Sequence, residues 1–260
     1  MSSAICLSDK QTSPDFKYGL EEKKLSLDAP KSDYTTVQIL AASLNHRDVY
    51  IMKNQFMGVT TGGVVWSDAD AEGPENAFAM LGLNPCIGVA AEKALVETNE
   101  IFKCPEHLSN LEAAALPLAG LTAYRAVFSK CGIKQGDNVL IIGIGGGVAL
   151  FALQFAVAVG ANVYVTSSNP EKIDRAVALG AKGGVNYKDA NCIQQLKDML
   201  NGGLIRAIVD GAGGSLYGQY PSVMKQGGVI ANYGQTSNEP IAFSMYQVAQ
   251  NIDLRGSTMG

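Results

Sequence analysis

A glycine-rich turn between an apolar strand and an apolar helix is the feature that most constrains this fold. The stretch Asn138–Ser168 reads NVLIIGIGGGVALFALQFAVAVGANVYVTSS, which predicts a strand, a tight turn, a helix and a second strand. Glycines suit the turn because they adopt backbone conformations that other residues rarely reach, and because bare backbone lets a ligand come close. Ala149 is small enough to let the helix pack against the strand. We therefore expect a βαβ unit whose turn binds a ligand.

The spacing of the glycines indicates the kind of ligand. Gly143, Gly146 and Ala149 match the pattern G-x-x-G-x-x-A, whereas the strict G-x-G-x-x-G pattern is not met because Val148 stands at its third position. A helix that begins after such a turn directs free N–H groups and the positive end of its dipole at the ligand, which suits a pyrophosphate. We interpret the segment as the dinucleotide-binding turn of a Rossmann fold. A glycine-rich turn in another α/β fold, such as a methyltransferase, is the alternative.

The rest of the second half alternates apolar runs with helical segments. Strands are predicted at Asn138–Gly143, Asn162–Thr166, Gly184–Tyr187, Arg206–Asp210, Gly228–Tyr233 and Ile252–Arg255. Helices are predicted at Gly147–Val159, Pro170–Leu179, Cys192–Leu200, Ser215–Met224 and Met245–Gln250. This alternation is typical of βαβ units with a parallel sheet that is covered on both faces. The predicted fold class is therefore α/β, with a Rossmann parallel sheet.

The end of the second predicted strand indicates which dinucleotide is bound. An Asp or Glu at that point would bind the ribose 2′-hydroxyl of NAD and repel a 2′-phosphate. This chain has Val165-Thr166-Ser167-Ser168 instead, and Lys172 and Arg175 follow on the next predicted helix. Hydroxyls and a cation suit a phosphate, so we favour NADP(H) as the cofactor. The alternative is that the two cations lie on an ordinary solvated helix face.

The first half of the chain is less regular. Strands are predicted at Tyr34–Ser43 and within Ile87–Val96, a loop over Met57–Ala79, and a helix at Glu106–Leu116. Ser109 and Glu112 have the spacing of a capping box at the start of that helix. Pro117 is expected to stop the helix or to kink it.

Composition narrows the classes of partner and site. Charged residues make up 17% of the chain and the net charge is −4, so nothing indicates nucleic acid or an anionic membrane as a partner. No uninterrupted apolar stretch reaches the roughly 18 residues of a membrane span, and no secretory signal is present, so we expect a cytoplasmic protein. The 5 cysteines are widely spaced and there are only 2 histidines, which favours reduced thiols over a zinc site.

Longer segments show that the chain resembles the medium-chain dehydrogenase/reductase superfamily, in particular its zinc-free quinone-oxidoreductase branch and alcohol-dehydrogenase-like fungal relatives. The resemblance is carried by Leu40–Gln55, Ala113–Val127, GIGGGVALFALQFA, SSNPEKIDRAVALGA, VDGAGG and LRGSTMG. It implies a partial GroES-like domain over residues 1–118 and an NADP(H)-binding Rossmann domain over residues 119–260. Zinc-dependent members carry a catalytic cysteine at the position of Asn45, so the asparagine implies a zinc-free member.

The resemblance also implies an activity and its residues. The chemistry is hydride transfer from NADPH to a quinone, enone or carbonyl, with Asn45 and Tyr50 lining the substrate cleft and Thr122 near the nicotinamide. The hydroxyl of Tyr50 or Thr122 would polarise the acceptor oxygen in place of zinc. As structural alternatives, Tyr50 is a surface aromatic and Thr122 a helix-start residue. Ser167, Lys172 and Tyr187 would surround the 2′-phosphate. The candidate cofactor-binding residues are then Gly143, Gly145, Gly146, Gly147, Val148, Ser167, Ser168, Lys172, Tyr187 and Tyr233.

Two departures from the family pattern bear on activity. Family members continue after the equivalent of Lys53-Asn54-Gln55 with a long stretch of barrel strands, whereas here Phe56-Met57-Gly58 passes into VVWSDADAEGPENAF. The chain also ends soon after the last predicted strand, where the family adds a helix. We therefore interpret it as shortened, and a relative that binds nucleotide or retains the fold without turnover is the second hypothesis. Because family members commonly dimerise through the edge strand, the resemblance also implies a homodimer formed near Ile252–Arg255.

Overall fold

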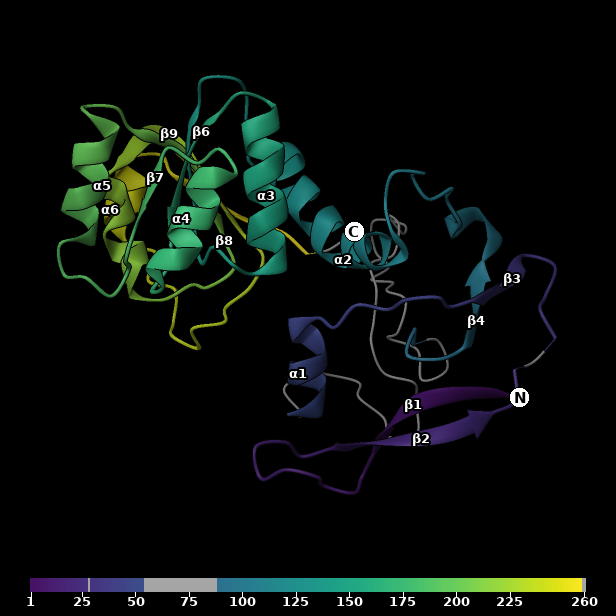
Figure 1. The fold of residues 1–260 in the computed structure, drawn as a ribbon. Coiled ribbons are helices and arrows are strands. Elements are labelled where there is room, and N and C mark those ends of the chain that lie inside the picture. The colour runs from purple at the N-terminus through teal and green to yellow at the C-terminus, as the bar shows by residue number, and fades with distance from the viewer. Residues whose placement is uncertain (28, 54–87, 259–260) are drawn as a thin grey trace. The chain divides into compact units, whose positions relative to one another are not determined.

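The structure is a computed structural model that describes residues 1–27, 29–53 and 88–258. It divides into two compact units, Met1–Ala119 and Gly120–Met259, and Figure 1 labels most of their helices and strands. The loop predicted over Met57–Ala79 lies outside the described residues, as does the first residue of the predicted Ile87–Val96 segment.

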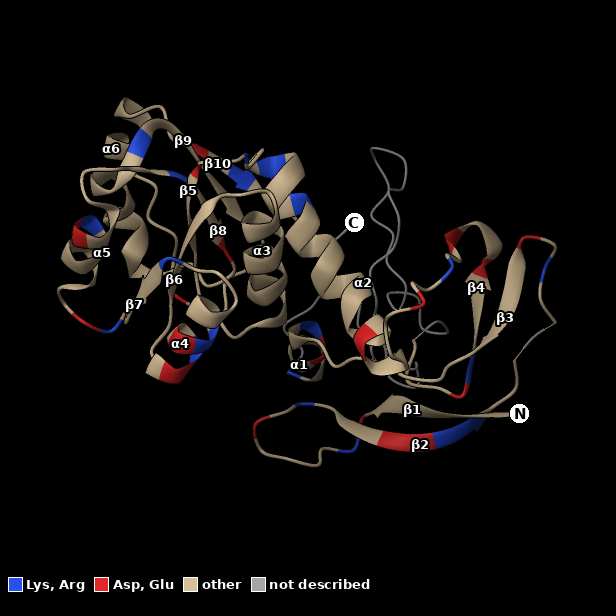
Figure 2. Ribbon diagram, turned by 45° about the horizontal axis from the view of Figure 1, so that its top comes forward, with Lys and Arg blue, Asp and Glu red and all other residues tan. Residues whose placement is uncertain are grey.

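The described part of the N-terminal unit is built on two small antiparallel sheets. They pair β1 (Ser2–Ser8) with β2 (Gly19–Leu25), and β3 (Tyr34–Gln38) with β4 (Lys93–Glu97). The helix α1 (His46–Met52) and the short turn η1 (Thr98–Glu100) complete it. β3 and β4 match predicted strands, whereas β1, β2 and α1 were not predicted. β2 offers no apolar pattern, because its middle consists of exposed charged residues, Glu21–Lys24. The ribbon in Figure 2 is coloured red and blue at these residues.

The helix α2 (Asn110–Tyr124) begins at the predicted capping box. The backbone N–H of Ser109 donates to the Glu112 carboxylate at 2.9 Å, and the Glu112 N–H donates to Ser109 Oγ at 3.3 Å. These reciprocal bonds satisfy two of the N–H groups that a helix start leaves without partners, which confirms the predicted capping box.

The same helix does not stop at Pro117, which was one of the two outcomes expected for this proline, the other being a kink. It runs on to Tyr124 and continues as the π-helical turn η2 (Arg125–Lys130). Beyond the proline the side chains of Ala123 and Ala126 are fully buried. Because tertiary packing supplies most of the stability of a protein helix, it offsets the single backbone hydrogen bond that proline cannot donate.

The C-terminal unit contains one six-stranded sheet in the order β10-β9-β8-β5-β6-β7, and every neighbouring pair is parallel. Its strands are β5 (Asn138–Ile141), β6 (Asn162–Thr166), β7 (Gly183–Val185), β8 (Ile205–Asp210), β9 (Met224–Asn232) and β10 (Asp253–Gly256). Each matches a predicted strand, which confirms the α/β Rossmann fold class. The chain order reverses at β5, since β6 and β7 lie on one side of it and β8, β9 and β10 on the other. Open α/β sheets bind ligands at the carboxyl ends of the strands beside such a switch point.

Helices connect these strands. The helices α3 (Gly147–Ala158), α4 (Pro170–Ala178), α5 (Cys192–Leu200) and α6 (Met245–Ala249) match four of the five predicted helices. The fifth prediction, over Ser215–Met224, is wrong. That segment forms two short 3-10 turns, η3 (Ser215–Gly218) and η4 (Tyr220–Ser222), before β9 begins. Gly218 and Pro221 explain why no α-helix forms here. Glycine destabilises a helix, and proline disfavours helical backbone in the residue before it.

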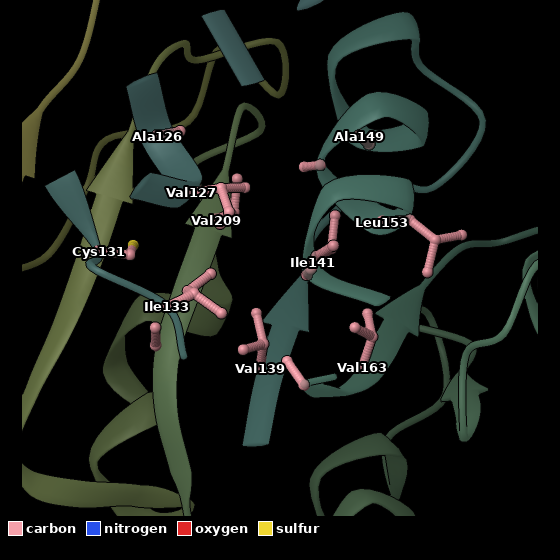
Figure 3. Close-up of a cluster of buried hydrophobic side chains, with 14 of the residues drawn as sticks. Ala126, Val127, Cys131, Ile133, Val139, Ile141, Ala149, Leu153, Val163 and Val209 are labelled. Atoms are coloured by element: carbon pink, nitrogen blue, oxygen red, sulfur yellow. The ribbon is translucent and has the colours of Figure 1, made fainter. Parts of the chain in front are cut away.

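The sheet separates two hydrophobic clusters. Because successive side chains of a strand point to opposite faces, Val139 and Ile141 of β5 enter one cluster and Leu140 and Ile142 enter the other. Figure 3 shows the first cluster, in which the side chains of β5 and its neighbouring strands lie close to Leu153 of α3. Both faces of the strands are therefore buried, as the continuous apolar runs predict. Among the described residues, no helix has the length and apolar character needed to span a membrane.

Candidate functional site

The turn that follows β5 has a conformation that only glycine adopts easily. Gly143 has a φ of +71° and Gly145 a φ of +111°, both in the region that other residues avoid. The N–H of Gly143 donates to Thr166 Oγ1 at 3.1 Å, and the N–H of Ile144 donates to the Thr166 carbonyl at 2.8 Å. The end of β6 therefore fixes the shape of the glycine turn.

The first turn of α3 is open to a ligand. Its N-cap is Gly146, which has no side chain to cap the helix, and Gly143, Gly145, Gly146 and Gly147 are all exposed. Val148 is half-buried in this first turn. A helix start without a side-chain cap leaves N–H donors and the positive end of the helix dipole directed outward, which is the arrangement that binds phosphates.

A cation lies directly against this turn. A Cβ atom placed on Gly145 would lie 2.6 Å from Cδ and 3.1 Å from Nζ of Lys172, so the exposed lysine side chain crosses the glycine. Lys172 belongs to α4, whose start is well fixed: Asn169 Oδ1 accepts the Glu171 N–H at 2.8 Å, and Pro170 occupies the first helical position. The capped helix thus brings a positive charge to the turn.

The two serines that follow β6 differ in availability. Ser167 is 5% exposed and its Oγ accepts the N–H of Asn169 at 3.2 Å, so this hydroxyl helps to shape the connection to α4. Ser168 is exposed. Thr166 of β6 pairs with Val185 of β7, and the two strands are parallel. Ser168 and the exposed Tyr187 therefore both follow the carboxyl ends of these adjacent strands. Of the predicted hydroxyl groups, those of Ser168 and Tyr187 are therefore the accessible ones.

The turn that follows β8 holds a carboxyl group that the sequence prediction did not include. Asp210 is 0% exposed, and its Oδ1 accepts the N–H groups of Ala212 at 2.7 Å and Gly213 at 3.2 Å. Burial raises the pKa of this carboxyl group above its ordinary value, although the hydrogen bonds act in the opposite direction. The signal in the sequence was an acid that ends an apolar strand directly before glycines, AIVDGAGG.

Tyr233, a predicted cofactor-binding residue, packs on the same turn. Its ring occupies the space where a Cβ of Gly211 would stand, and its N–H donates to the Asp210 carbonyl at 2.9 Å. Burial raises the pKa of its hydroxyl group. Tyr233 therefore packs against the turn after β8 and stabilises it.

The three predicted catalytic residues fall in different units. Asn45 is the N-cap residue of α1, and its N–H donates to the Asp48 carboxylate at 2.8 Å. Tyr50 lies on the same helix, with its ring edge-on to His46 at 4.8 Å between centroids. Thr122 belongs to the C-terminal unit, where it is 5% exposed on α2. The structure thus brings Asn45 and Tyr50 together on one helix, and it gives Asn45 a helix-capping role of its own.

Metal-ligating side chains do not gather in the part of the chain that the structure describes. Within residues 1–27, 29–53 and 88–258, no group of three or more His, Cys, Asp or Glu side chains is arranged to hold a metal ion. The four described cysteines, Cys6, Cys104, Cys131 and Cys192, are free thiols, and Cys86 lies outside the described residues.

Known proteins are similar to this chain in both sequence and fold. The family model described as zinc-binding dehydrogenase matches residues 147–260. The zinc-type alcohol dehydrogenase-like protein YogA of Leptosphaeria maculans is 36% identical, over 94% of this chain and 80% of its own length. The crystal structure of an NAD-dependent alcohol dehydrogenase has a TM-score of 0.80 at 26% identity, covering 99% of this chain and 85% of that one. The Escherichia coli quinone oxidoreductase complexed with NADPH has the same fold, with a TM-score of 0.80 at 21% identity over 99% of this chain and 81% of that one.

Proposed function

Because the chain belongs to the medium-chain dehydrogenase/reductase superfamily of oxidoreductases, we propose that it uses NADPH, without zinc, to reduce a quinone, an enone or a carbonyl compound. When bound, the cofactor supplies the hydride. The chain supplies the binding site, the orientation of the two reactants and the hydrogen-bond donors that polarise the acceptor.

The geometry of the glycine turn fits a dinucleotide. The exposed glycines and the uncapped start of α3 offer backbone N–H groups to a pyrophosphate, and Gly145, whose positive φ suits glycine, adds no side chain of its own to the turn. We assign this function to Gly143, Gly145, Gly146, Gly147 and Val148.

The single observation that carries the choice of NADPH is the position of Lys172. Its ammonium group lies across Gly145, beside the end of β6, where Ser167 and Ser168 stand in place of the acid that NAD requires. A 2′-phosphate bound there would accept hydrogen bonds from the lysine ammonium group and from the exposed hydroxyl groups of Ser168 and Tyr187. Ser167 would act by shaping the backbone, since its own hydroxyl accepts a hydrogen bond from Asn169.

The decisive measurement of the cofactor is a titration with NADPH and NADH. We expect NADPH to bind more tightly, and Lys172→Ala to weaken NADPH about tenfold or more while it leaves NADH nearly unchanged, because the lost ion pair involves only the 2′-phosphate. Lys182→Ala is the matched control, since this exposed lysine lies at the opposite, amino-terminal end of β7. Tighter binding of NADH than NADPH, or no effect of Lys172→Ala, would refute the assignment.

The acceptor chemistry is assigned to Asn45, Tyr50 and Thr122. A hydroxyl donor at the acceptor oxygen stabilises the negative charge that develops there as hydride arrives, which is the function a zinc ion has in zinc-dependent relatives. Oxidation of NADPH with 1,4-benzoquinone, followed at 340 nm, tests turnover. We expect Tyr50→Phe or Thr122→Val to lower kcat while NADPH affinity stays the same, because neither hydroxyl group is assigned to cofactor binding.

A second candidate function is nucleotide binding without turnover. It is favoured by the sequence after Lys53-Asn54-Gln55, where Phe56-Met57-Gly58 passes into VVWSDADAEGPENAF in place of the barrel strands of the family pattern. Binding of NADPH without oxidation by quinones, enones or aldehydes would select this candidate over the enzyme.

We also propose a homodimer through β10. This strand ends the sheet, and each of its four residues is exposed, so its outer edge offers unpaired backbone groups to a second copy. Sedimentation should give a dimer, and Leu254→Pro should give a monomer because proline cannot donate to a strand pair. A wild-type monomer at micromolar concentration would refute this.

A further inference from the structure

We propose that Asp210 is a positioning residue, whose buried carboxyl group holds the turn Gly211–Gly214 in the shape that receives the nicotinamide half of the dinucleotide. The proposal rests on the proposed cofactor. It assigns the function to a side chain that lies outside the glycine motif and that the ligand itself need not touch.

The carboxyl group of Asp210 accepts hydrogen bonds from the turn and from a neighbouring side chain. Its Oδ1 accepts from the N–H of Ala212 at 2.7 Å, and both oxygens lie 3.2 Å from the N–H of Gly213. The hydroxyl of Tyr217 also donates to the carboxyl group, and the Asn232 amide donates to the Tyr217 oxygen at 3.2 Å. Asp210 is therefore the centre of a buried hydrogen-bond network rather than a surface acid.

The turn needs this support because its backbone is unusual. Gly213 and Gly214 have φ values of +70° and +92°. Because glycine populates many backbone conformations, these two residues would sample others if no contacts held the turn. On its other side the turn is attached to the segment after β9, through the N–H of Thr236 to the Gly211 carbonyl at 3.1 Å and the N–H of Ser237 to the Ala212 carbonyl at 3.0 Å. Asp210 thus fixes one side of a turn whose other side is already held.

The location of the turn gives it a function. A Rossmann sheet consists of two mononucleotide-binding halves, and the ligand crosses the switch point between them. The glycine turn and Lys172 assign the adenosine half to β5, β6 and β7, which leaves β8, β9 and β10 to the nicotinamide. β8 is the strand next to β5, since the N–H of Ile142 donates to the Val209 carbonyl at 3.0 Å. The turn held by Asp210 therefore begins beside the glycine turn, at the start of the second half.

The two halves can be tested separately with two ligands. 2′,5′-ADP carries the adenosine and the 2′-phosphate without a nicotinamide, whereas NADPH carries both and reports on the nicotinamide through its own fluorescence. In Asp210→Ala, we expect 2′,5′-ADP to bind within about twofold of wild type, while NADPH binds about tenfold more weakly and its fluorescence no longer changes on binding. Asp210→Asn should keep both signals close to wild type, because an amide oxygen still accepts from Ala212 and Gly213.

Several results would overturn the proposal. One is a normal NADPH affinity and fluorescence change in Asp210→Ala, and another is an equal loss of both ligands, which would indicate a general structural role. If Asp210→Ala does not fold, Gly213→Val disturbs the same turn without removing the carboxyl group, and it should likewise affect NADPH but not 2′,5′-ADP. A wild-type protein that binds 2′,5′-ADP but not NADPH overturns the assignment of the nicotinamide half alone. A wild-type protein that binds neither overturns the proposed function as well.

Discussion

At the scale of single residues, Gly145 combines a backbone requirement with a side-chain requirement. Its φ of +111° disfavours any other residue, and a Cβ at this position would collide with Lys172. We expect Gly145→Ala to weaken NADPH binding, because it strains the turn and moves the end of the lysine side chain that we assign to the 2′-phosphate.

The control for this substitution is Gly136→Ala. Gly136 also has a positive φ, of +81°, but no atom lies within 4 Å of the Cβ that alanine would add, and it lies in the turn before β5. Both variants should lose about 1–2 kcal/mol of stability from the strained backbone. Only Gly145→Ala should bind the nucleotide more weakly in a fluorescence titration, and an equal weakening in both variants would contradict the specific function of Gly145.

Among the cysteines, burial predicts a clear order of reactivity. Desolvation raises the pKa of Cys131 to about 12, whereas Cys104 is exposed. At pH 8 we expect iodoacetamide to label Cys104 in the native protein and to leave Cys6, Cys131 and Cys192 unmodified until urea is added, because only an accessible thiolate reacts. Peptide mass spectrometry gives the extent at each site. Rapid labelling of Cys131 in the folded protein would contradict the described core.

At the scale of elements, α3 connects the glycine turn to the core. Leu153 is 0% exposed and packs in the cluster of Figure 3. Leu153→Ala should lower the free energy of unfolding by about 2–5 kcal/mol, since it removes buried methyl groups and leaves a cavity.

The matched control is Val177→Ala on α4, where the side chain is 45% exposed. Its effect should stay within about 0.5 kcal/mol, as for most surface substitutions. Urea denaturation compares the two variants. Equal losses would show that the interior of the sheet does not contribute as the burial pattern requires.

The C-terminal unit was predicted well because its signals are local. Continuous apolar runs mark the strands, and Asn169 with Pro170 marks the start of a helix that the structure confirms. The prediction over Ser215–Met224 was wrong because apolar side chains there, among them Tyr217 and Tyr220, cover the sheet from short turns rather than from a helix. Apolar residues in a short segment indicate burial, and they do not by themselves indicate helix.

For the candidate site, the sequence predicted the glycine turn and its cation but not the network around Asp210. The glycines stand close together in sequence and so form a motif. The network joins Asp210, Tyr217 and Asn232 from a strand, a turn and the following strand, and only the fold brings them together. For Asn45 the sequence alone could not decide between two functions, because an asparagine suits both a substrate cleft and a helix N-cap. The structure places Asn45 at the N-cap of α1.

At the scale of the whole molecule, the division into two units predicts where a ligand will stabilise the protein. A cofactor present at a hundred times its Kd adds about 2.7 kcal/mol to the stability of the state that binds it. With NADPH, hydrogen exchange should slow in Gly143–Leu150 and Thr166–Lys172 and remain unchanged in β1 and β2, which hold none of the assigned cofactor residues. Protection confined to the N-terminal unit would contradict the assignment of the cofactor to the C-terminal unit.

The strand order also has a consequence for biosynthesis. β5 pairs on one side with β6, the next strand to be made, but on the other side with β8, which emerges from the ribosome only after β7 and α5. Until then the β8 side of β5, with its apolar residues Val139 to Ile141, has no partner strand. An unpaired apolar edge is a template for pairing with another chain, so the nascent protein is open to mispairing at β5 in the interval between the synthesis of β5 and of β8.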